Sequence, residues 1–128
     1  MDFWKVLLIP FACLYGFVVR IRHVLFNANI LKSESFSIPV IGVGNLSLGG
    51  TGKTPVVEYL IRLLSDESKL AVLSRGYGRN TKGFLIANQY SGHKDIGDES
   101  LQYHNKFTQN VKVAVCEDRR EGITNLMQ

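Results

Sequence analysis

The sequence predicts an α/β protein in which helices flank a parallel sheet and an apolar helix precedes that sheet. Three observations support this fold class. An apolar stretch, Phe3–Phe26, opens the chain. From Ser37 onward, short apolar runs alternate with stretches of helical period, which is typical of βαβ units. Between the first of these apolar runs and the first of these helices, a glycine-rich turn ends in Gly52-Lys53-Thr54.

The composition describes a folded protein with an anionic partner. The chain has 128 residues, about one domain, and its apolar fraction of 45% is too high for a disordered tail. A net charge of +4 suits a nucleotide, an acidic lipid or nucleic acid without choosing among them. Cys13 and Cys116 match no metal-ligand spacing, which indicates a reducing compartment. Glu121–Gln128 opens a helix without a stop signal, so we expect an incomplete domain, the N-terminal part of a longer protein.

Residues 1–30 are expected to form an amphipathic, membrane-associating helix. The uncharged run Val6–Val19 is shorter than the roughly 20 residues that a spanning helix needs. Arg20 and Arg22 follow it, where a signal peptide would carry small residues at its cleavage site. Two interpretations stay open: a helix in the membrane interface with arginines at the headgroups, or a helix packed on a neighbouring protein surface.

Residues 31–128 are expected to form the N-terminal part of the sheet domain. Its strands are expected at Ile38–Val43, Leu70–Ser74, Gly83–Ala87 and Val111–Cys116. Its helices are expected at Thr54–Leu64, at Asp98–Phe107 and from Arg119 onward. Strands separated by helices imply a parallel sheet that is covered on both faces.

The glycine-rich turn predicts a phosphate-binding loop, because it follows a strand and opens a helix. Glycines let the backbone turn tightly and aim its N–H groups at phosphate, and the helix N-terminus adds a positive dipole end. The expected residues for ATP are Gly49, Gly50, Thr51, Gly52, Lys53 and Thr54. Lys53 would reach the β- and γ-phosphates, and the Thr54 hydroxyl would bind Mg²⁺. A flexible turn before an ordinary helix is the alternative, which this context disfavours.

Two positions of the loop depart from better-known patterns. Ser47 stands where the general phosphate-loop pattern requires glycine. Leu48 stands where partitioning and septum-site ATPases carry a lysine that reaches the nucleotide of a partner subunit. Leucine cannot supply that charge, which argues against this subclass and not against nucleotide binding.

Several segments in order resemble the tetraacyldisaccharide 4′-kinase family, the lipid A 4′-kinases. They are Val43–Pro55 in the loop, Leu73-Ser74-Arg75-Gly76-Tyr77-Gly78-Arg79, Ile96-Gly97-Asp98-Glu99 and, in the apolar helix, Leu14-Tyr15-Gly16. Ser47 is ordinary in that family's loop, whereas Ser100 stands where the family has proline. The resemblance covers nearly the whole chain and implies a P-loop NTPase-like kinase fold.

The resemblance implies a kinase that transfers the γ-phosphoryl of ATP, with Mg²⁺, to the 4′-hydroxyl of a tetraacyl-glucosamine disaccharide 1-phosphate. It implies the cytoplasmic face of the bacterial inner membrane and no nucleic-acid partner. Because an acylated substrate stays in the bilayer, the N-terminal helix would bring the enzyme to the membrane surface. The alternative is a membrane-recruited nucleotide switch without a small-molecule acceptor.

The resemblance also implies roles for single residues. Asp98 would be the catalytic carboxylate that orients or deprotonates the sugar hydroxyl, and Glu99 would help to arrange magnesium or that base. Lys53 would be catalytic together with these two carboxylates. Arg75 would bind a nucleotide or substrate phosphate, and Tyr77 and Arg79 lie beside it. Without the family, Asp98 reads as a helix cap and the two arginines as a solvated turn.

Other polar residues have structural interpretations. His23, His93 and His104 show no ligand spacing. In the family, the supporting histidine and a magnesium-binding acid lie beyond residue 128, so we expect this fragment to be inactive alone. We interpret Glu117-Asp118 as the start of the last helix and not as a metal site at the end of a strand.

Overall fold

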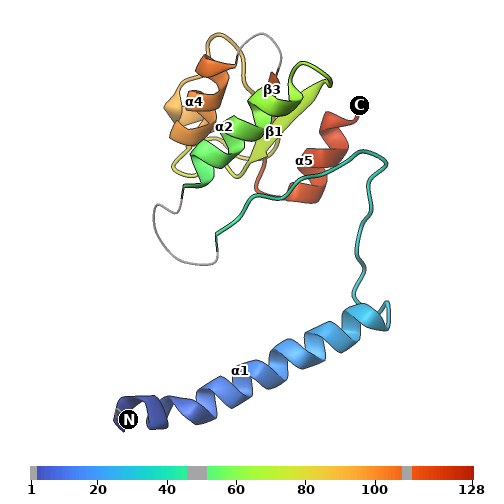
Figure 1. The fold of residues 1–128 in the computed structure, drawn as a ribbon, viewed down its shortest axis with the longest axis vertical. Coiled ribbons are helices and arrows are strands. Elements are labelled where there is room, and N and C mark those ends of the chain that lie inside the picture. The colour runs from blue at the N-terminus through green and yellow to red at the C-terminus, as the bar shows by residue number, and fades with distance from the viewer. Residues whose placement is uncertain (1–2, 46–51, 108–110) are drawn as a thin grey trace. The chain divides into compact units, whose positions relative to one another are not determined.

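The computed structural model describes residues 3–45, 52–107 and 111–128. The chain divides into two compact units, Met1–Val40 and Ile41–Gln128. The first unit consists mainly of a long helix, and the second holds the sheet and the remaining helices (Figure 1).

The first unit contains helix α1, Phe3–Asn27, close to the predicted bounds. The helix ends where Asn29 takes a left-handed φ of 54°, a conformation that asparagine tolerates. Among the described residues, the stretch Leu8–Asn27 is long and apolar enough to cross a membrane by length and composition. It exceeds the uncharged run Val6–Val19 because the helix continues past the two arginines. Length therefore does not exclude a spanning helix, contrary to the expectation from that run.

The second unit contains a sheet of three strands in the order β1-β3-β2. β1, Leu70–Ser74, runs parallel to β3, Val111–Val115, as predicted. β2, Leu85–Ile86, runs antiparallel to β3, so the sheet is mixed and the prediction of an all-parallel sheet is wrong here. The reason lies in the connection from β1, residues 75–84. It contains no helix, whereas a parallel crossover needs a dozen or more residues and usually a helix.

Helices cover both faces of this sheet. α2, Lys53–Leu64, and α4, Asp98–Lys106, contribute Ile61 and Tyr103 to a core with Val111 and Val113 of β3. α5, Arg119–Leu126, packs on the other face. Figure 1 shows α2 and α4 on one side of the sheet and α5 on the other. The predicted two-sided cover is confirmed, and a short helix that was not predicted, α3 at His93–Ile96, precedes α4.

The predicted strand Ile38–Val43 is not a strand in the structure. Residues 39–45 have no regular secondary structure, and Val40 and Ile41 are 53% and 62% exposed. A strand exists only with a hydrogen-bonded neighbour, and the described strands pair among themselves without this segment. Pro39 also lacks the N–H that pairing would use at its position.

Candidate functional site

The described part of the phosphate loop is its end. Gly49, Gly50 and Thr51, like Ser47 and Leu48, lie outside the described residues. Gly52 precedes α2 with φ 79° and ψ 21°, a left-handed conformation that favours glycine. Lys53 begins the helix and Thr54 follows it in the first turn. The predicted helix start after Gly-Lys-Thr is therefore confirmed to within one residue.

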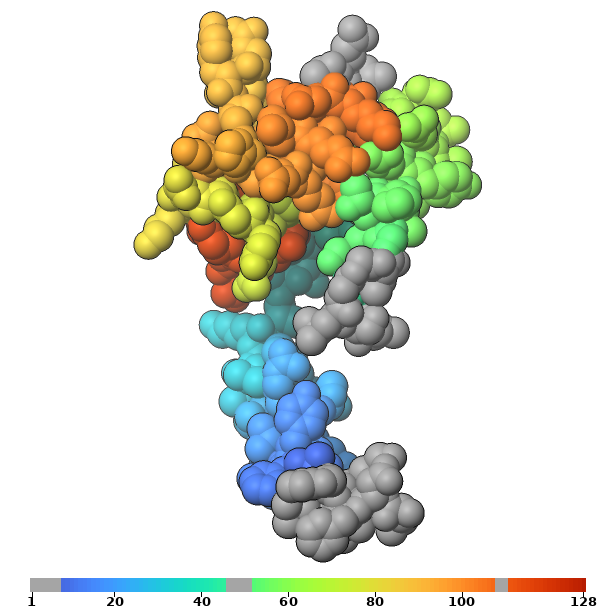
Figure 2. Space-filling view, turned by 90° about the vertical axis from the view of Figure 1, so that its left-hand side faces the viewer, coloured from blue at the N-terminus to red at the C-terminus, as the bar shows by residue number. Residues whose placement is uncertain are grey.

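The first turns of α2 and α4 meet through a hydroxyl and a carboxylate. Thr54 Oγ1 donates a hydrogen bond of 3.1 Å to Glu99 Oε1. Tyr103, one turn further along α4, donates its hydroxyl to the same oxygen over 2.8 Å. Further along, Gln102 donates to Glu58 Oε1 over 2.9 Å, so the two helices are joined at more than one level. Figure 2 shows the surface of α4 directly against that of α2.

Tyr103 holds the Glu99 carboxylate from the protein interior. Its side chain is buried, and burial followed by the hydrogen bond to Glu99 raises the pKa of Tyr103 to about 12. The phenol therefore stays protonated and donates at neutral pH. A tyrosine one helical turn after an acidic residue is a sequence signal for this contact, although Tyr103 was not among the predicted residues.

The oxygen atoms at this contact fit a hard divalent cation. Mg²⁺ prefers oxygen ligands, is usually held by one or two carboxylates, and keeps several waters. The Thr54 hydroxyl and the Glu99 carboxylate supply two such groups within hydrogen-bond distance. No cluster of three or more His, Cys, Asp or Glu side chains suited to a metal occurs in the part of the chain that the structure describes.

Asp98 occupies the first turn of α4 without capping the helix. The N-cap is Gly97, whose φ of 79° and ψ of 160° are open to glycine alone. A Cβ atom on Gly97 would lie 2.6 Å from the Tyr77 carbonyl oxygen, so the chain is closely packed there. The side chain of Asp98 is exposed and has no hydrogen bond or ion pair with the described residues. The capping alternative is therefore wrong.

The carboxyl end of β1 lies against α4. The Ser74 hydroxyl, at the end of β1, shares a hydrogen bond with the Ser100 hydroxyl in the first turn of α4. Arg75 follows directly and is exposed. Five of the predicted site residues therefore lie on segments joined by hydrogen bonds: Lys53, Thr54, Arg75, Asp98 and Glu99. Ligands of open α/β sheets bind at such carboxyl ends.

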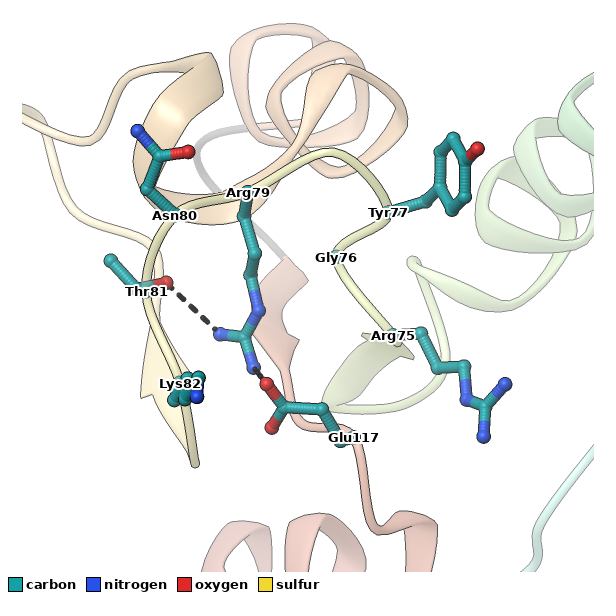
Figure 3. Close-up of a pocket in the computed structure, with 8 residues that line it drawn as sticks. All are labelled: Arg75, Gly76, Tyr77, Arg79, Asn80, Thr81, Lys82 and Glu117. Atoms are coloured by element: carbon teal, nitrogen blue, oxygen red, sulfur yellow. Dashed lines mark hydrogen bonds and ion pairs between the residues drawn. The ribbon is translucent and has the colours of Figure 1, made fainter.

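The loop that begins at Arg75 lines, together with Glu117, a pocket of about 350 Å³ (Figure 3). Arg79 points inward across this pocket to Glu117, whereas Arg75 points away from that pair. The side chain of Arg79 is only 3% exposed, so the solvated-turn alternative is wrong for Arg79.

Asp118 caps α5 by accepting the Arg120 N–H over 2.8 Å, which confirms the predicted helix start.

Comparison with known proteins agrees with these motifs. The family model described as tetraacyldisaccharide-1-P 4′-kinase matches residues 4–128. The chain belongs to the tetraacyldisaccharide 4′-kinase family. A tetraacyldisaccharide 4′-kinase of Flavobacterium psychrophilum is 54% identical over 127 residues, which are 99% of this chain and 37% of that relative. One of Parabacteroides distasonis is 55% identical over 121 residues, 94% of this chain and 32% of that relative.

A solved structure of the family shares the fold. The structure of "apo" form LpxK from Aquifex aeolicus in complex with ATP is 38% identical, with a TM-score of 0.75. The match covers 98% of this chain and 41% of that one. The chain thus spans about a third of the length of the curated relatives that it matches.

Proposed function

We propose that the full-length protein is a kinase that transfers the γ-phosphoryl group of ATP to the 4′-hydroxyl of a tetraacyldisaccharide 1-phosphate. Family membership over residues 4–128 supports the reaction, and the ATP complex of the Aquifex aeolicus relative supports the donor. The observation in this chain that carries the proposal is the contact of Thr54 with Glu99. It joins the end of the phosphate loop to the acidic turn that would face the acceptor.

The binding roles follow from the ends of the helices. Lys53 and the free N–H groups of the first turn of α2 would hold the β- and γ-phosphates, together with Gly49, Gly50, Thr51 and Gly52 of the loop. Thr54 and Glu99 would hold Mg²⁺, which when bound would neutralise charge that develops on the phosphate oxygens. Arg75 would add a cation for a phosphate group at the end of β1.

Asp98 would orient the 4′-hydroxyl and accept its proton as the hydroxyl oxygen attacks the γ-phosphorus. Its exposed carboxylate, with no partner among the described residues, is available for that hydrogen bond. Glu99, in contrast, is already engaged by Thr54 and Tyr103, which suits a holding role better than that of a base.

We further propose that α1 brings the protein to the cytoplasmic face of the bacterial inner membrane. Its large apolar side chains are widely exposed within its unit; Phe11 and Tyr15, for example, are 66% and 72% exposed. Arg20 and Arg22 follow these residues in the same helix and suit anionic headgroups. Because an acylated acceptor stays in the bilayer, such a helix would bring the enzyme to its substrate.

The test is a kinase assay of the full-length protein with MgATP and tetraacyldisaccharide 1-phosphate. We expect a product that carries phosphate at the 4′ position. Lys53→Ala should lower kcat by at least about 100-fold, because one preorganised charge on the transferred group is commonly worth that much. Lys69→Ala, an exposed lysine before β1, is the matched control and should retain activity. Absence of product from the wild type, or an active Lys53→Ala variant, would refute the proposal.

A further inference from the structure

Arg79 differs from the other arginines of the second unit in its burial. Its Nη2 lies 2.8 Å from Glu117 Oε1 and also donates a hydrogen bond of 2.8 Å to the Gly83 carbonyl oxygen. Its Nη1 donates to Thr81 Oγ1 over 3.2 Å. A guanidinium that is 3% exposed and held at both terminal nitrogens is not free to bind a phosphate from solvent.

Glu117 binds the same turn from the opposite direction. Its Oε2 accepts the Gly83 N–H over 3.0 Å, while Arg79 binds the Gly83 carbonyl oxygen. Its own backbone N–H, and then that of Gly83 and the Arg79 guanidinium, lower the pKa of Glu117, so it stays ionised. Glu117 directly follows Cys116, which is buried like Val115 at the end of β3. The two residues therefore fasten the loop 75–83 to the carboxyl end of β3.

The same loop is attached to the segment that leads to Asp98. The Asn80 N–H donates to the Lys94 carbonyl oxygen over 2.7 Å. The Thr81 hydroxyl, which accepts from Arg79, donates to the Asp95 carbonyl oxygen. Gly97 then packs on the Tyr77 carbonyl oxygen so closely that it leaves no room for a Cβ atom. The residue after Gly97 is Asp98.

We propose that Arg79 and Glu117 are a positioning pair that fixes the loop 75–83 and, through it, the start of α4 with Asp98. The inference rests on the proposed kinase function. It assigns Arg79 a role other than contact with a substrate or nucleotide phosphate, and it leaves Arg75 as the exposed arginine of this loop that would meet one. Figure 3 shows this division, with Arg79 turned toward Glu117 and Arg75 turned outward.

The first test is a set of variants of the full-length protein, Arg79→Gln, Glu117→Gln and the double variant. We expect each single change to lower kcat by about 10- to 100-fold with little change in KM for either substrate, because misplacement of a reacting group acts on the chemical step. The double variant should be no slower than the slower single variant, since both changes remove one interaction. Arg79→Lys, which keeps the charge, should recover part of the activity.

Arg62→Gln is the matched control, because Arg62 is an exposed arginine that also pairs with a carboxylate, that of Glu58 at 3.9 Å. It should leave kcat unchanged. A direct phosphate ligand would behave differently. If Arg79→Gln raises KM while Glu117→Gln keeps wild-type kinetics, the positioning pair is refuted. Glu117→Gln decides the matter even if Arg79→Gln fails to fold, because the Glu117 side chain is 52% exposed.

The second test does not depend on activity. Hydrogen exchange of the Asn80 and Gly83 amides should be faster in Glu117→Gln than in the wild type, and unchanged in Arg62→Gln. Unchanged exchange in Glu117→Gln would refute the pair whatever the kinase assay gives. A wild type without kinase activity would refute the proposed function, and the exchange data would still decide whether the pair fixes the loop.

Discussion

Asp98 and Glu99 are neighbours in one helical turn with different surroundings. Glu99 accepts hydrogen bonds from Thr54 and Tyr103, while Asp98 faces solvent. The Glu99 carboxylate is thus held by hydrogen bonds, whereas the Asp98 carboxylate is available to bind a ligand. That difference is our reason for proposing Asp98 as the proton acceptor and Glu99 as the holding residue.

Asp98→Asn should lower kcat by about 100- to 10,000-fold, the usual contribution of a general base. KM for ATP should change little, because the phosphate loop and Lys53 are untouched. The melting temperature should also change little, since Gly97 and not Asp98 is the N-cap of α4. Steady-state kinetics and thermal unfolding of the full-length variant check this. A lower melting temperature with unchanged kcat would assign Asp98 a structural role instead.

Gly76 is the glycine that the Arg79 side chain requires. Its φ is 69°, and a Cβ there would lie 2.4 Å from Arg79 Cδ and 3.2 Å from Val115 Cβ. Gly78 has a similar φ of 79° with open space around it. Comparing substitutions at the two glycines therefore distinguishes the cost of a left-handed backbone from the cost of contact with Arg79.

Gly76→Ala should lower the free energy of unfolding by about 1–2 kcal/mol for the left-handed backbone and by about 1–3 kcal/mol more for overpacking. Gly78→Ala should lower the free energy of unfolding only by the cost of the left-handed backbone, about 1–2 kcal/mol. Urea unfolding of both full-length variants measures the difference. Equal losses would show that Arg79 moves aside freely, and its packing against Gly76 would then have no energetic weight.

At the scale of elements, the sequence predicted what depends on local pattern. α2, β1, β3 and α5 lie close to their predicted positions because helical period, β-branched runs and the Asp118 cap are local signals. Two features depend on strand pairing across the whole sheet, which local sequence does not determine. They are the antiparallel direction of β2 and the irregular conformation of Ile38–Val43.

The same distinction holds for the site. Lys53, Thr54, Asp98 and Glu99 were predicted as site residues from motifs, and the contact of Thr54 with Glu99 is a consequence of packing α4 beside α2. The Arg79–Glu117 pair could not be predicted, because it requires β1 and β3 to be neighbours with parallel carboxyl ends. Tyr103 was missed although its spacing from Glu99 is a helical one.

Gly122 shows how tightly α5 packs on β1. A Cβ atom on Gly122 would lie 2.6 Å from Leu73 Cδ2 and 3.1 Å from Cys116 Cβ. Alanine in a helix is normally better than glycine by about 0.5–1 kcal/mol. Here overpacking should cost about 1–3 kcal/mol and outweigh that gain.

Gly122→Ala should therefore lower the melting temperature of the full-length protein. Gly16→Ala is the contrasting change, because Gly16 in α1 has no atom within 4 Å of a built Cβ, and there the gain in helix propensity should stand alone. Calorimetry of both variants tests this. If Gly122→Ala proves as benign as Gly16→Ala, α5 is free to shift away from Leu73 and the contact is not a constraint.

At the scale of the whole molecule, the two units divide the proposed work. The second unit contains the residues that we propose bind phosphate and accept the proton. The first contains an apolar helix with exposed side chains such as Leu14, Phe17 and Ile21. A large apolar side chain buried in lipid contributes about 1.5–3 kcal/mol, so a few are enough for membrane binding. Arg20 and Arg22 would each add about 1 kcal/mol on an anionic surface.

Phe17→Ser combined with Ile21→Ser should therefore weaken binding to vesicles by about 100-fold or more, since two such side chains together are worth about 3–6 kcal/mol. Arg20→Ala with Arg22→Ala should weaken binding to anionic vesicles and leave binding to neutral vesicles unchanged. Deletion of residues 1–30 should abolish both. Co-sedimentation of the full-length variants with phosphatidylglycerol and phosphatidylcholine vesicles measures these differences. If the deletion variant still sediments with vesicles, α1 is not the membrane contact, and its apolar surface belongs to a protein neighbour.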